Sequence, residues 1–563
     1  MTWRFYSAED LRLATAVVRD LKLAPFLIPI LARAGFVDAE AARDFLYPRL
    51  KGLADPFSLP GIEPAVTRIL QAVDRGEKIV LYGDYDVDGV TSVALLTRVL
   101  RAYGTEPGRF LPHRIEEGYG LTREGLERCL RQHRPRLLIA LDCGTSSADQ
   151  IGELEADGVN VIVLDHHETK HTQPACTAFI NPKAGHSFHY LCTVGIVFKL
   201  CHALLKRRRL PGLDLREFLD LVAVGTVADL VPLVEENRTL VTFGLRQLAR
   251  TRWVGLRALM QVAAVSPPVR PVHVGYRLGP RLNAAGRLGV ALDALNLLLS
   301  DDEGEADVLA RKLDAQNRDR QQVEEATLRE AVQLVLADPE ALAHPAIVVG
   351  AKGWHPGVVG IVASRLMRRF HRPALVISFD AEGTGKGSGR SIAGFSLVRS
   401  LEQCAPFLTA YGGHEMAAGL SLPFDRLQTF REAFLAVSRR YLDPARLGPV
   451  LDVTASMEGH DLDGALWDAH ELLQPFGMGN PQPLLCFRKV QPVGEPRLLK
   501  EKHRLLTLRH RQQFLRAIQF NSAEHVLPPP PWDVAFHLEA NQYLGRLEPQ
   551  VQVEAIRSAV DDG

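Results

Sequence analysis

The sequence predicts an α/β protein with a buried parallel sheet, followed by a second α/β lobe and a small C-terminal β-barrel. Three observations support this fold class. Short apolar runs alternate with amphipathic helical stretches, one long helical stretch contains no glycine or proline, and the residues after 447 form short β-type runs. Strands that are buried on both faces are continuously apolar, and their alternation with helices indicates parallel pairing.

The first lobe contains three such apolar runs. They are KIVLY (78–82), LLIAL (137–141) and VNVIVL (159–164), and each ends at a polar cluster. The first run is followed by a turn and then by the amphipathic stretch VTSVALLTRVLRAYG. We expect LREFLDLVAVGTVADL (215–230) to form a buried helix that leads into a loop.

A long helix is predicted between Glu305 and Asp338, where charged and apolar positions alternate without a helix breaker. A single helix of roughly 30 residues usually connects two lobes. Strand–helix alternation resumes after it with AIVVG (346–350), VVGIVASRLMRRF (358–370) and PALVISF (373–379). A glycine-rich segment, GTGKGSGRS, occupies 383–391, and a helix is expected at 426–442.

The C-terminal runs are separated by turn signals, as in a small barrel such as the OB-fold. The whole pattern predicts five regions. They are a helical segment at 1–60, a catalytic domain at 61–300, a connecting helix at 301–339, a substrate-binding domain at 340–446 and a nucleic-acid-binding barrel at 447–563.

Charge and cysteine usage limit the class of protein. The 66 basic residues balance the 66 acidic ones, so binding to nucleic acid would have to come from a local patch. The seven cysteines contain no CxxC pair, which is typical of reduced thiols in the cytoplasm. The charged N-terminus disfavours a signal peptide, and no apolar run is long enough for a membrane span.

The chemistry is expected where acidic and histidine residues follow successive predicted elements. In an open α/β sheet, the loops at the carboxyl ends of the strands meet in one crevice. The residues concerned are Asp84, Asp86 and Asp88 after the first strand, Asp142 after the second, Asp165, His166 and His167 after the third, and Asp229 after the 215–226 helix.

So many carboxylates in one crevice require cations, because each ionised group raises the pKa of its neighbours. Oxygen-rich ligand sets with imidazole and no thiolate suit Mn²⁺ or Mg²⁺ better than zinc. Two such ions are a standard arrangement for phosphodiester hydrolysis. The alternative, that each acid is only a helix cap or a loop residue, is reasonable for one acid but not for four clusters.

Four segments resemble motifs of the DHH phosphoesterase superfamily: GDYDVDG, LDCG, VLDHHE and GTVADLVPL. The resemblance implies that all eight residues named above are catalytic. It also implies two divalent cations, Mn²⁺ or Mg²⁺, with ligands drawn from all of them except Asp165. Which of Asp84, Asp86 and Asp88 bind metal directly is left open.

Six further segments resemble the branch of this superfamily that degrades single-stranded DNA from the 5′ end. They are HRIEEGYGL (113–121), GYRLGPRLNAAGRL (275–288), WHPGVVGIVASRL (354–366), KGSGRS (386–391), GGHEMAAG (412–419) and PFGMGNPQP (475–483). The implied activity is a 5′→3′ exonuclease that releases 5′-mononucleotides in DNA repair and recombination. Implied partners are single-stranded DNA, a single-strand-binding protein and a recombination helicase.

Candidate substrate-binding residues lie in the same segments. In KGSGRS the glycines are expected to expose backbone N–H groups, and Ser388 and Arg390 add donors for a phosphate. The full set is Arg114, Arg277, Arg281, Asn283, Arg287, His355, Ser388, Gly389, Arg390, Gly413 and His414. Alternatives remain open: a hairpin turn for KGSGRS, a helix cap for His355, surface ion pairs for the arginines and a solvated strand face for the basic stretch at 500–511.

Three rival functions are weaker. A DHH enzyme for very short RNA or for 3′-phosphoadenosine phosphate would lack the barrel. A non-catalytic DNA-binding replication component would have lost metal ligands, whereas every acid is present here. A soluble pyrophosphatase would have different motifs in its second lobe.

Overall fold

The structure, a computed structural model, describes residues 2–5, 8–36, 38–113, 117–118, 120–169, 172–185, 188–288, 291–457, 462, 464–543 and 546–559. Its contacts divide the chain into two compact units. One contains Asp55–Asp229 and Gly244–Pro449, and the other contains Met1–Ala54, Leu230–Phe243 and Val450–Gly563. Each unit is described by itself.

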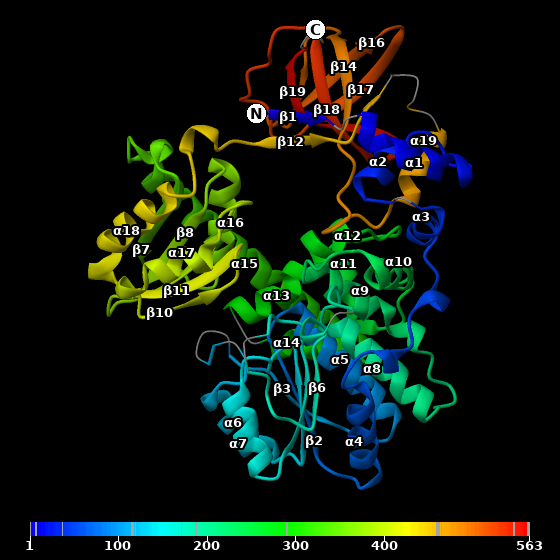
Figure 1. The fold of residues 1–563 in the computed structure, drawn as a ribbon, viewed down its shortest axis with the longest axis vertical. Coiled ribbons are helices and arrows are strands. Elements are labelled where there is room, and N and C mark those ends of the chain that lie inside the picture. The colour runs from blue at the N-terminus through cyan, green and yellow to red at the C-terminus, as the bar shows by residue number, and fades with distance from the viewer. Residues whose placement is uncertain are drawn as a thin grey trace. The chain divides into compact units, whose positions relative to one another are not determined.

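The larger unit begins with an all-parallel, five-stranded sheet of order β3-β2-β4-β5-β6 (Figure 1). Its strands are β2 Ile79–Gly83, β3 Gly108–Phe110, β4 Leu137–Leu141, β5 Asn160–Leu164 and β6 Ala178–Ile180. The surrounding helices are α4 Ile62–Asp74, α5 Val87–Ala102, α6 Arg123–His133, α7 Ala148–Ala156 and α8 Thr193–Arg207. The predicted parallel sheet is confirmed.

Helices cover both faces of this sheet. Val80 and Tyr82 of β2 pack in one hydrophobic cluster with α6 and α7, while α4, α5 and α8 lie on the opposite face (Figure 1). The central strands β2, β4 and β5 are buried along almost their whole length. This explains why they are continuously apolar in the sequence.

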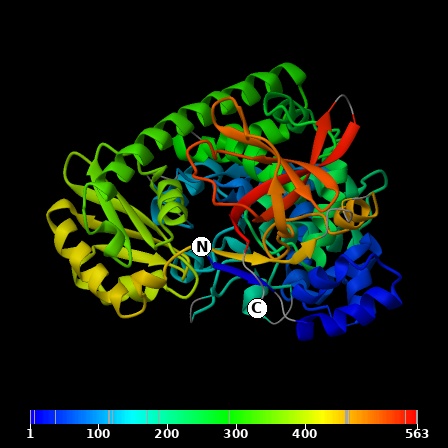
Figure 2. The ribbon, with the colours of Figure 1, turned by 90° about the horizontal axis from the view of Figure 1, so that it is seen from above.

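A helical region follows the sheet, and it ends in the long helix α15. Its elements are α9 Leu219–Ala228, α10 Glu235–Leu248, α11 Val254–Val262, α12 Pro271–His273, a π-helical turn η5 Val274–Leu278, α13 Gly279–Leu288, α14 Leu292–Leu299 and α15 Glu303–Leu336. Helix α10 belongs to the smaller unit up to Phe243 and to the larger unit from Gly244. Helix α15 has 34 residues, about 50 Å at 1.5 Å per residue, and is shown in Figure 2. Asp302 caps it by accepting the Glu305 N–H at 2.7 Å.

Beyond α15 lies a second sheet of order β10-β11-β9-β8-β7, in which only β7 and β8 are parallel. Its elements are β7 Ile347–Lys352, α16 Val359–Phe370, β8 Ala374–Phe379, β9 Thr384–Arg390, α17 Leu397–Gln403, β10 Ala410–Gly413, β11 Ala417–Pro423 and α18 Leu427–Arg439.

Short 3₁₀ turns occur along the chain. They are η1 Leu50–Gly52, η2 Pro56–Ser58, η3 Pro182–Ala184, η4 Leu215–Phe218, η6 Ala341–Ala343, η7 Ala405–Phe407, η8 Phe424–Arg426 and η9 Pro444–Arg446.

The glycine-rich segment corrects one expectation. It is neither an open loop nor a hairpin turn, because β9 is a central strand that pairs with β8 on one side and β11 on the other. Its backbone N–H groups are therefore used in the sheet. A side chain at Gly385, Gly387 or Gly389 would collide with the core residues of β8. The glycines serve packing, and only the side chains of the other strand face remain for a ligand.

The smaller unit contains the expected barrel. Strands β14, β18, β19, β17 and β16 follow one another, and pairing of β16 with β14 closes the circle. The strands are β12 Val450–Val453, β13 Ala455–Met457, β14 Leu485–Pro492, β15 Arg497–Leu499, β16 His503–His510, β17 Gln513–Gln519, β18 Trp532–Tyr543 and β19 Arg546–Ser558, with α19 Gly464–Leu472 between β13 and β14. The prediction of an OB-like barrel is confirmed.

The N-terminal helices belong to the same unit as the barrel. They are α1 Ala8–Asp20, α2 Leu27–Arg33 and α3 Ala39–Leu46, and they share a hydrophobic core with Ala469 and Leu473. Strand β1 Thr2–Phe5 pairs in parallel with β12. The two ends of the chain therefore build one core.

Arg238 ties three segments of this unit together. It is 1% exposed, and its guanidinium donates to the carbonyl oxygens of Phe45, Leu472, Leu473 and Gln474 at 2.5–3.0 Å. These carbonyls lie at the ends of α3 and α19, where a helix leaves acceptors without intrahelical donors. Burial lowers the pKa of Arg238 to about 9. Its positive charge is balanced by helix carbonyls and by the face of the Phe45 ring, 3.7 Å away.

Replacing Arg238 with methionine should destabilise this unit by about 3 kcal/mol or more, because several buried carbonyl groups lose their donor. Denaturant unfolding followed by tryptophan fluorescence measures the change. Arg19→Met, at an exposed position on α1, is the control and should change stability by less than about 1 kcal/mol. Equal stability of the two variants would show that the Arg238 contacts contribute little.

Candidate metal centre

Three aspartates directly follow the last residues of three adjacent strands. The backbone N–H groups of Asp84, Asp142 and Asp165 donate to the carbonyl oxygens of Leu141, Leu164 and Ile180, at 2.9–3.1 Å. Each aspartate is therefore fixed to the last residue of the neighbouring strand. All three are at most 4% exposed. The sheet itself places their carboxylates in one row at its carboxyl edge.

Asp142 has a left-handed backbone conformation, with φ of 64°. Residues other than glycine avoid this region, although aspartate and asparagine tolerate it best. The turn at the end of β4 thus directs the Asp142 carboxylate toward the histidines. A strained position of this kind is frequent in functional sites.

The loop between β2 and α5 supplies two more acids. Asp86 caps α5 by accepting the N–H groups of Asp88 and Gly89 at 2.9 and 3.2 Å. Asp88, on the first turn of α5, accepts the N–H groups of Thr193 and Val194 at 2.7 and 2.8 Å. The start of α8 therefore holds the Asp88 carboxylate in place.

His166 lies at the centre of the cluster. Its Nε2 atom is 3.4 Å from both Asp142 Oδ1 and Asp229 Oδ2, and 3.8 Å from Asp88 Oδ2. His167 lies beside it, with Nδ1 3.9 Å from Asp142 Oδ1. The structure brings together residues from four separate sequence motifs, as the sequence predicts.

Asp165 has a different part from the other acids. It accepts the N–H groups of Thr145, His166 and His167, and its Oδ1 atom is 2.7 Å from Nδ1 of the His167 ring. Burial opposes ionisation of Asp165, but these hydrogen bonds outweigh it and lower its pKa below the usual range. Asp165 therefore orients the His167 imidazole, which leaves the other ring nitrogen for a ligand.

Three groups of side chains offer metal-ligand atoms within 4.8 Å of one another. They are Asp142, His166 and His167; Asp84, Asp86 and Asp142; and Asp88, Cys192 and Asp229. In the part of the chain that the structure describes, both ring nitrogens of His166 and Oδ2 of Asp229 are buried without a hydrogen-bond partner. Buried polar atoms without partners are costly, and divalent cations would satisfy them. The donor set fits Mn²⁺ or Mg²⁺.

The pKa values of the clustered side chains also indicate a site for divalent cations. Burial and the nearby Asp86 raise the pKa of Asp88 to about 7. Burial and the surrounding carboxylates raise the pKa of Asp142 and of Asp229 well above the ordinary value. Burial lowers the pKa of His166 to about 3. The protein alone thus disfavours the charged acids and keeps His166 neutral, the form that ligates a metal.

The arginines predicted to bind substrate have different surroundings in the structure. Arg281 is bound to Asp314 at 2.9 Å, and Arg277 donates to the Ala264 carbonyl oxygen. Arg287 donates to the Gly357 carbonyl oxygen at 3.1 Å, and together with Asn283 it lines a cavity. Arg114 lies outside the described residues. The ion-pair alternative therefore holds for Arg281.

Ser388 and Arg390 share one face of β9 beneath the start of α16. Arg390 donates to Ser388 Oγ at 2.9 Å, and a Cβ atom at Gly360 would lie 3.1 Å from Ser388 Oγ. His355 Nδ1 accepts the Gly357 N–H at 3.0 Å, in the turn that precedes α16, so it holds this turn and does not cap the helix. Gly389 faces the core on the opposite side of the strand, where a side chain would collide with Leu375, so close packing rather than a ligand explains the glycine.

The β10–β11 hairpin carries the last two candidates. Gly413 has a φ of 138°, and a side chain there would collide with Ala417 and Ala418, so the turn requires glycine. Partial desolvation lowers the pKa of His414, His167 and Lys183 act in the same direction, and Glu168 opposes them. His414 is therefore within electrostatic reach of the metal-centre residues.

Comparison with known proteins agrees with this geometry. Residues 78–226 match the N-terminal domain of the DHH family, residues 343–439 the DHHA1 domain, and residues 453–555 the RecJ OB domain. The "Single-stranded-DNA-specific exonuclease RecJ" of Escherichia coli is 34% identical over 95% of this chain and 96% of its own length. This chain belongs to the RecJ family.

Other members of the RecJ family are similarly close. RecJ of Bacillus subtilis is 35% identical over 98% of this chain and 70% of its own length. The crystal structure of RecJ from Thermus thermophilus in complex with Mn²⁺ has a TM-score of 0.85, at 34% identity, over 100% of this chain and 80% of that one. The corresponding Mg²⁺ complex has a TM-score of 0.80, at 32% identity, over 100% and 79%.

Sequence reasoning missed several residues of this RecJ-family site. Thr193 Oγ donates to Asp142 Oδ1 at 2.9 Å, and Asn181 Nδ2 donates to the His167 carbonyl oxygen at 2.9 Å. Cys192 lies with Asp88 and Asp229. Neutral residues and a lone thiol carry no pattern of their own. The start of the helix after β6 was the available signal.

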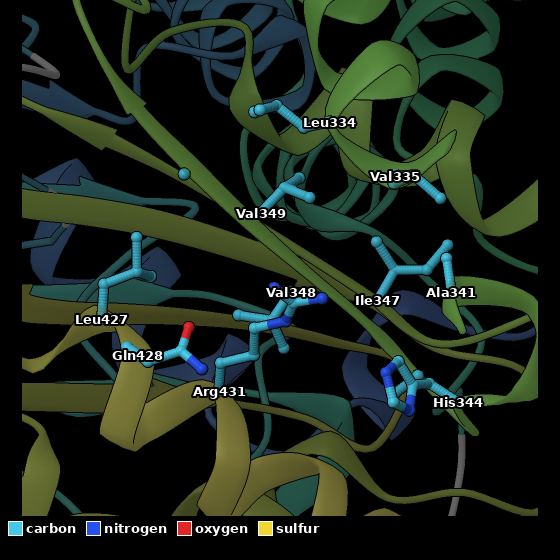
Figure 3. Close-up of a pocket in the computed structure, with 12 residues that line it drawn as sticks. Leu334, Val335, Ala341, His344, Ile347, Val348, Val349, Leu427, Gln428 and Arg431 are labelled. Atoms are coloured by element: carbon cyan, nitrogen blue, oxygen red, sulfur yellow. The ribbon is translucent and has the colours of Figure 1, made fainter. Parts of the chain in front are cut away.

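A second cavity is not part of this site. It has a volume of about 140 Å³ and lies along the edge strand β7, between α15 and α18 (Figure 3). Its lining includes both apolar side chains and the polar His344, Gln428 and Arg431, and Arg431 is bound to Asp338 at 2.6 Å. None of the predicted site residues lines it.

Among the described residues, no helix is both long and apolar enough to cross a bilayer.

Proposed function

We propose that this chain is a 5′→3′ exonuclease that hydrolyses single-stranded DNA with two divalent cations and releases 5′-mononucleotides in DNA repair and recombination. The observation that carries the proposal is the metal centre. Ionisable side chains from four motifs lie within ligand distance of one another, and the His166 imidazole is buried among them without a hydrogen-bond partner among the described residues. The names of the RecJ relatives support the substrate class.

The metals would be held by Asp84, Asp86, Asp88, Asp142, His166, His167 and Asp229. When bound, two divalent cations polarise the phosphodiester, activate water and stabilise charge on the attacking and leaving oxygens. The related RecJ structures are complexes with Mn²⁺ and with Mg²⁺, which supports either ion.

The chain itself supplies orientation. Asp165 fixes the tautomer and direction of the His167 ring, and Thr193 fixes the rotamer of Asp142. The N–H groups of Thr193 and Val194 hold Asp88. These contacts keep the ligand atoms preorganised, so little rearrangement is needed when substrate binds.

The terminal phosphate would be held by Ser388 and Arg390. Both project from one face of β9 against the start of α16, whose N-terminus favours an anion. A site that binds the 5′-terminal phosphate would explain why cleavage starts at the 5′ end of the strand. By the same resemblance Arg114 would contribute to it.

The barrel would guide the strand. Basic residues cluster on and around β16, and Phe514 and Phe520 are exposed aromatics on and next to β17. Exposed aromatic rings stack with bases, and the cations neutralise phosphates. The basic residues are Lys500, Lys502, His503, Arg504, Arg509 and Arg511. A single-strand-binding protein and a recombination helicase are the proposed partners, and the cytoplasm the proposed location.

Arg390→Ala should raise KM about tenfold or more for strands with a 5′-phosphate and much less for strands with a 5′-hydroxyl. A charge-assisted hydrogen bond to phosphate is lost in the first case only. Steady-state kinetics on matched oligonucleotides measure the effect. Arg399→Ala, at an exposed position on α17, is the control. Equal losses on both substrates would show that Arg390 does not recognise the terminus.

Direction is tested by blocking one end of the strand. A single strand carrying streptavidin at its 3′ end should be digested from the free end, and a strand blocked at its 5′ end should persist, with Mn²⁺ present in both reactions. Duplex DNA of the same sequence is the control and should also persist. Digestion of the 5′-blocked strand alone would reverse the proposed polarity.

A further inference from the structure

The strongest unassigned feature is the cavity lined by Asn283 and Arg287. Its volume is about 130 Å³, several times the roughly 30 Å³ that one water occupies in the liquid. It is lined by Ala228, the residue before Asp229, by Gly275 of the π-helical turn, by Ile361 of α16 and by Arg320 of α15. One wall of the cavity is therefore the residue next to a candidate metal ligand.

Arg320 stands at the middle of α15 in a row of buried polar residues. It is 8% exposed, and Asn317 and Glu324 on the same helix are 2% and 3% exposed. Arg320 Nη1 donates to Glu324 Oε2 at 2.5 Å, while Nε and Nη2 donate to Asn317 Oδ1 at 3.3 and 3.0 Å. A helix that only connected two lobes would not need such a network, because buried charges are costly.

Arg320 lines the cavity and has donors that the network does not use. A guanidinium has five N–H groups, and three of those of Arg320 are used. The other two, one on each terminal nitrogen, and the Asn283 amide have no hydrogen-bond partner within the described ranges of the chain. Glycine and proline of η5 and α13 leave the space open in front of them.

The charges around the cavity favour an anion. Glu324 is shared, because Arg365 Nε also lies 2.9 Å from Glu324 Oε1. Two arginines thus share one carboxylate, and Arg287 adds a further positive charge. No carboxylate occurs among the described residues that line the cavity. A planar fork of guanidinium donors with an amide suits the oxygens of a phosphate group.

We propose that Arg320, with Arg287 and Asn283, binds a phosphodiester group of the substrate strand next to the bond that is cleaved. This inference rests on the proposed function and adds Arg320 to it as a substrate-binding residue. Arg320 would fix the register of the strand on the metals, and Asn317 and Glu324 would fix the Arg320 rotamer. The long helix would then form part of the active site in addition to linking the lobes.

The test measures binding of a 5′-phosphorylated oligothymidylate of eight nucleotides to the full-length protein, with Ca²⁺ in place of Mn²⁺. Arg320→Gln should weaken binding about tenfold or more. It should also reduce the slope of log K against log salt by about 0.7, the value for one phosphate contact on a single strand. Arg318→Gln is the matched control, because Arg318 is on the same helix but 66% exposed and paired with Asp314.

A neutral methylphosphonate linkage, placed in turn at each internucleotide position, identifies the phosphate. At one position it should weaken binding by the wild type but not by Arg320→Gln. Penalties that are the same in both proteins at every position would overturn the proposal. A purely structural role of Arg320 would not produce a loss confined to one linkage.

Glu324→Gln covers the case in which Arg320→Gln does not fold. Glutamine keeps an acceptor oxygen that fixes the Arg320 rotamer but removes the negative charge that Arg320 and Arg365 share, so the variant should bind the strand at least as tightly as the wild type at low salt. Weaker binding by a folded Glu324→Gln protein would count against the proposal. Failure of the wild type to digest the strand with Mn²⁺ would instead overturn the proposed function, so the two failures are distinguishable.

Discussion

Replacing Asp142 with asparagine is expected to lower the rate of strand hydrolysis at least about 1,000-fold, the upper end of what loss of one electrostatic contact costs. Asp142 is common to two of the three ligand groups and lies between the two histidines and the strand ends. An amide in its place keeps the shape but weakens the hold on both metal positions.

Asparagine is chosen because the backbone of Asp142 has a φ of 64°. Asparagine tolerates this left-handed conformation, whereas alanine would add backbone strain to the loss of charge. The variant also removes one of several crowded negative charges. Without metal, Asp142→Asn should therefore be at least as stable as the wild type, although it is inactive.

Single-turnover digestion of end-labelled single-stranded DNA and a melting curve in EDTA test both halves of this expectation. Asp149→Asn, on α7 of the same lobe, is the matched control and should leave both unchanged. Hydrolysis by Asp142→Asn at a tenth of the wild-type rate would remove Asp142 from the catalytic set. An unfolded variant would contradict the charge-crowding explanation.

Removing the metals should destabilise the protein, and increasingly so as the pH rises from about 4 to 8. The pKa of Asp88 is raised by burial to about 7, and those of Asp142 and Asp229 are also raised. In the unfolded chain these groups lose their protons near pH 4. Between these two pKa values the unfolded chain loses its protons more readily than the folded protein does. Each increase in pH therefore shifts the equilibrium toward the unfolded state, and the free energy of unfolding falls.

The histidines modify this trend without reversing it. The pKa of His166 is lowered to about 3, so its contribution to stability is present above pH 6.5 and is lost as the pH falls through 3. The pKa of His167 is raised, because its hydrogen bond to Asp165 outweighs burial, and its contribution is lost as the pH rises. Three acids and His167 act against His166 in this range, and Asp165, whose pKa is lowered, is ionised in both the folded and the unfolded state above about pH 5 and adds no slope there.

Melting temperatures in EDTA and in Mn²⁺ at pH 5, 6, 7 and 8 measure the effect. Metal binding cancels the repulsion between the carboxylates and competes with protons. The gap between the two melting temperatures should therefore widen with pH. A gap that is absent, or that narrows from pH 5 to pH 8, would contradict the assignment of these residues as metal ligands.

The sequence predicts the metal lobe well for a simple physical reason. Strands β2, β4 and β5 are buried on both faces, so their apolar runs are unbroken, and the acids follow where each strand ends. The parallel arrangement then requires these acids to converge. The long helix can also be predicted from the sequence, because there is no glycine or proline between Glu305 and Asp338. Its observed bounds are Glu303–Leu336.

The glycine-rich segment misleads because glycine has two uses. It permits unusual backbone conformations, and it also permits close packing. At Gly385, Gly387 and Gly389 the second use applies, since the neighbouring strand β8 presents large side chains there. Only the partner strand reveals this, and local sequence does not specify the partner.

Contacts between distant segments are the other part that local patterns cannot provide. Strand β1 pairs with β12 across more than 400 residues, and Thr193 reaches Asp142 from the start of a helix whose first two turns carry no acidic residue or histidine. Arg281 was one of several equivalent arginines until Asp314 was placed beside it. Each of these depends on tertiary packing.

The proposed function requires that the cluster around His166 holds two divalent cations on which hydrolysis depends. Equilibrium binding of Mn²⁺, counted by electron paramagnetic resonance and followed alongside digestion of single-stranded DNA, tests it most directly. We expect two Mn²⁺ ions per chain, with hydrolysis appearing as the second ion binds, and fewer than two in Asp142→Asn. Hydrolysis by metal-free protein, or two tightly bound ions in Asp142→Asn, would contradict it.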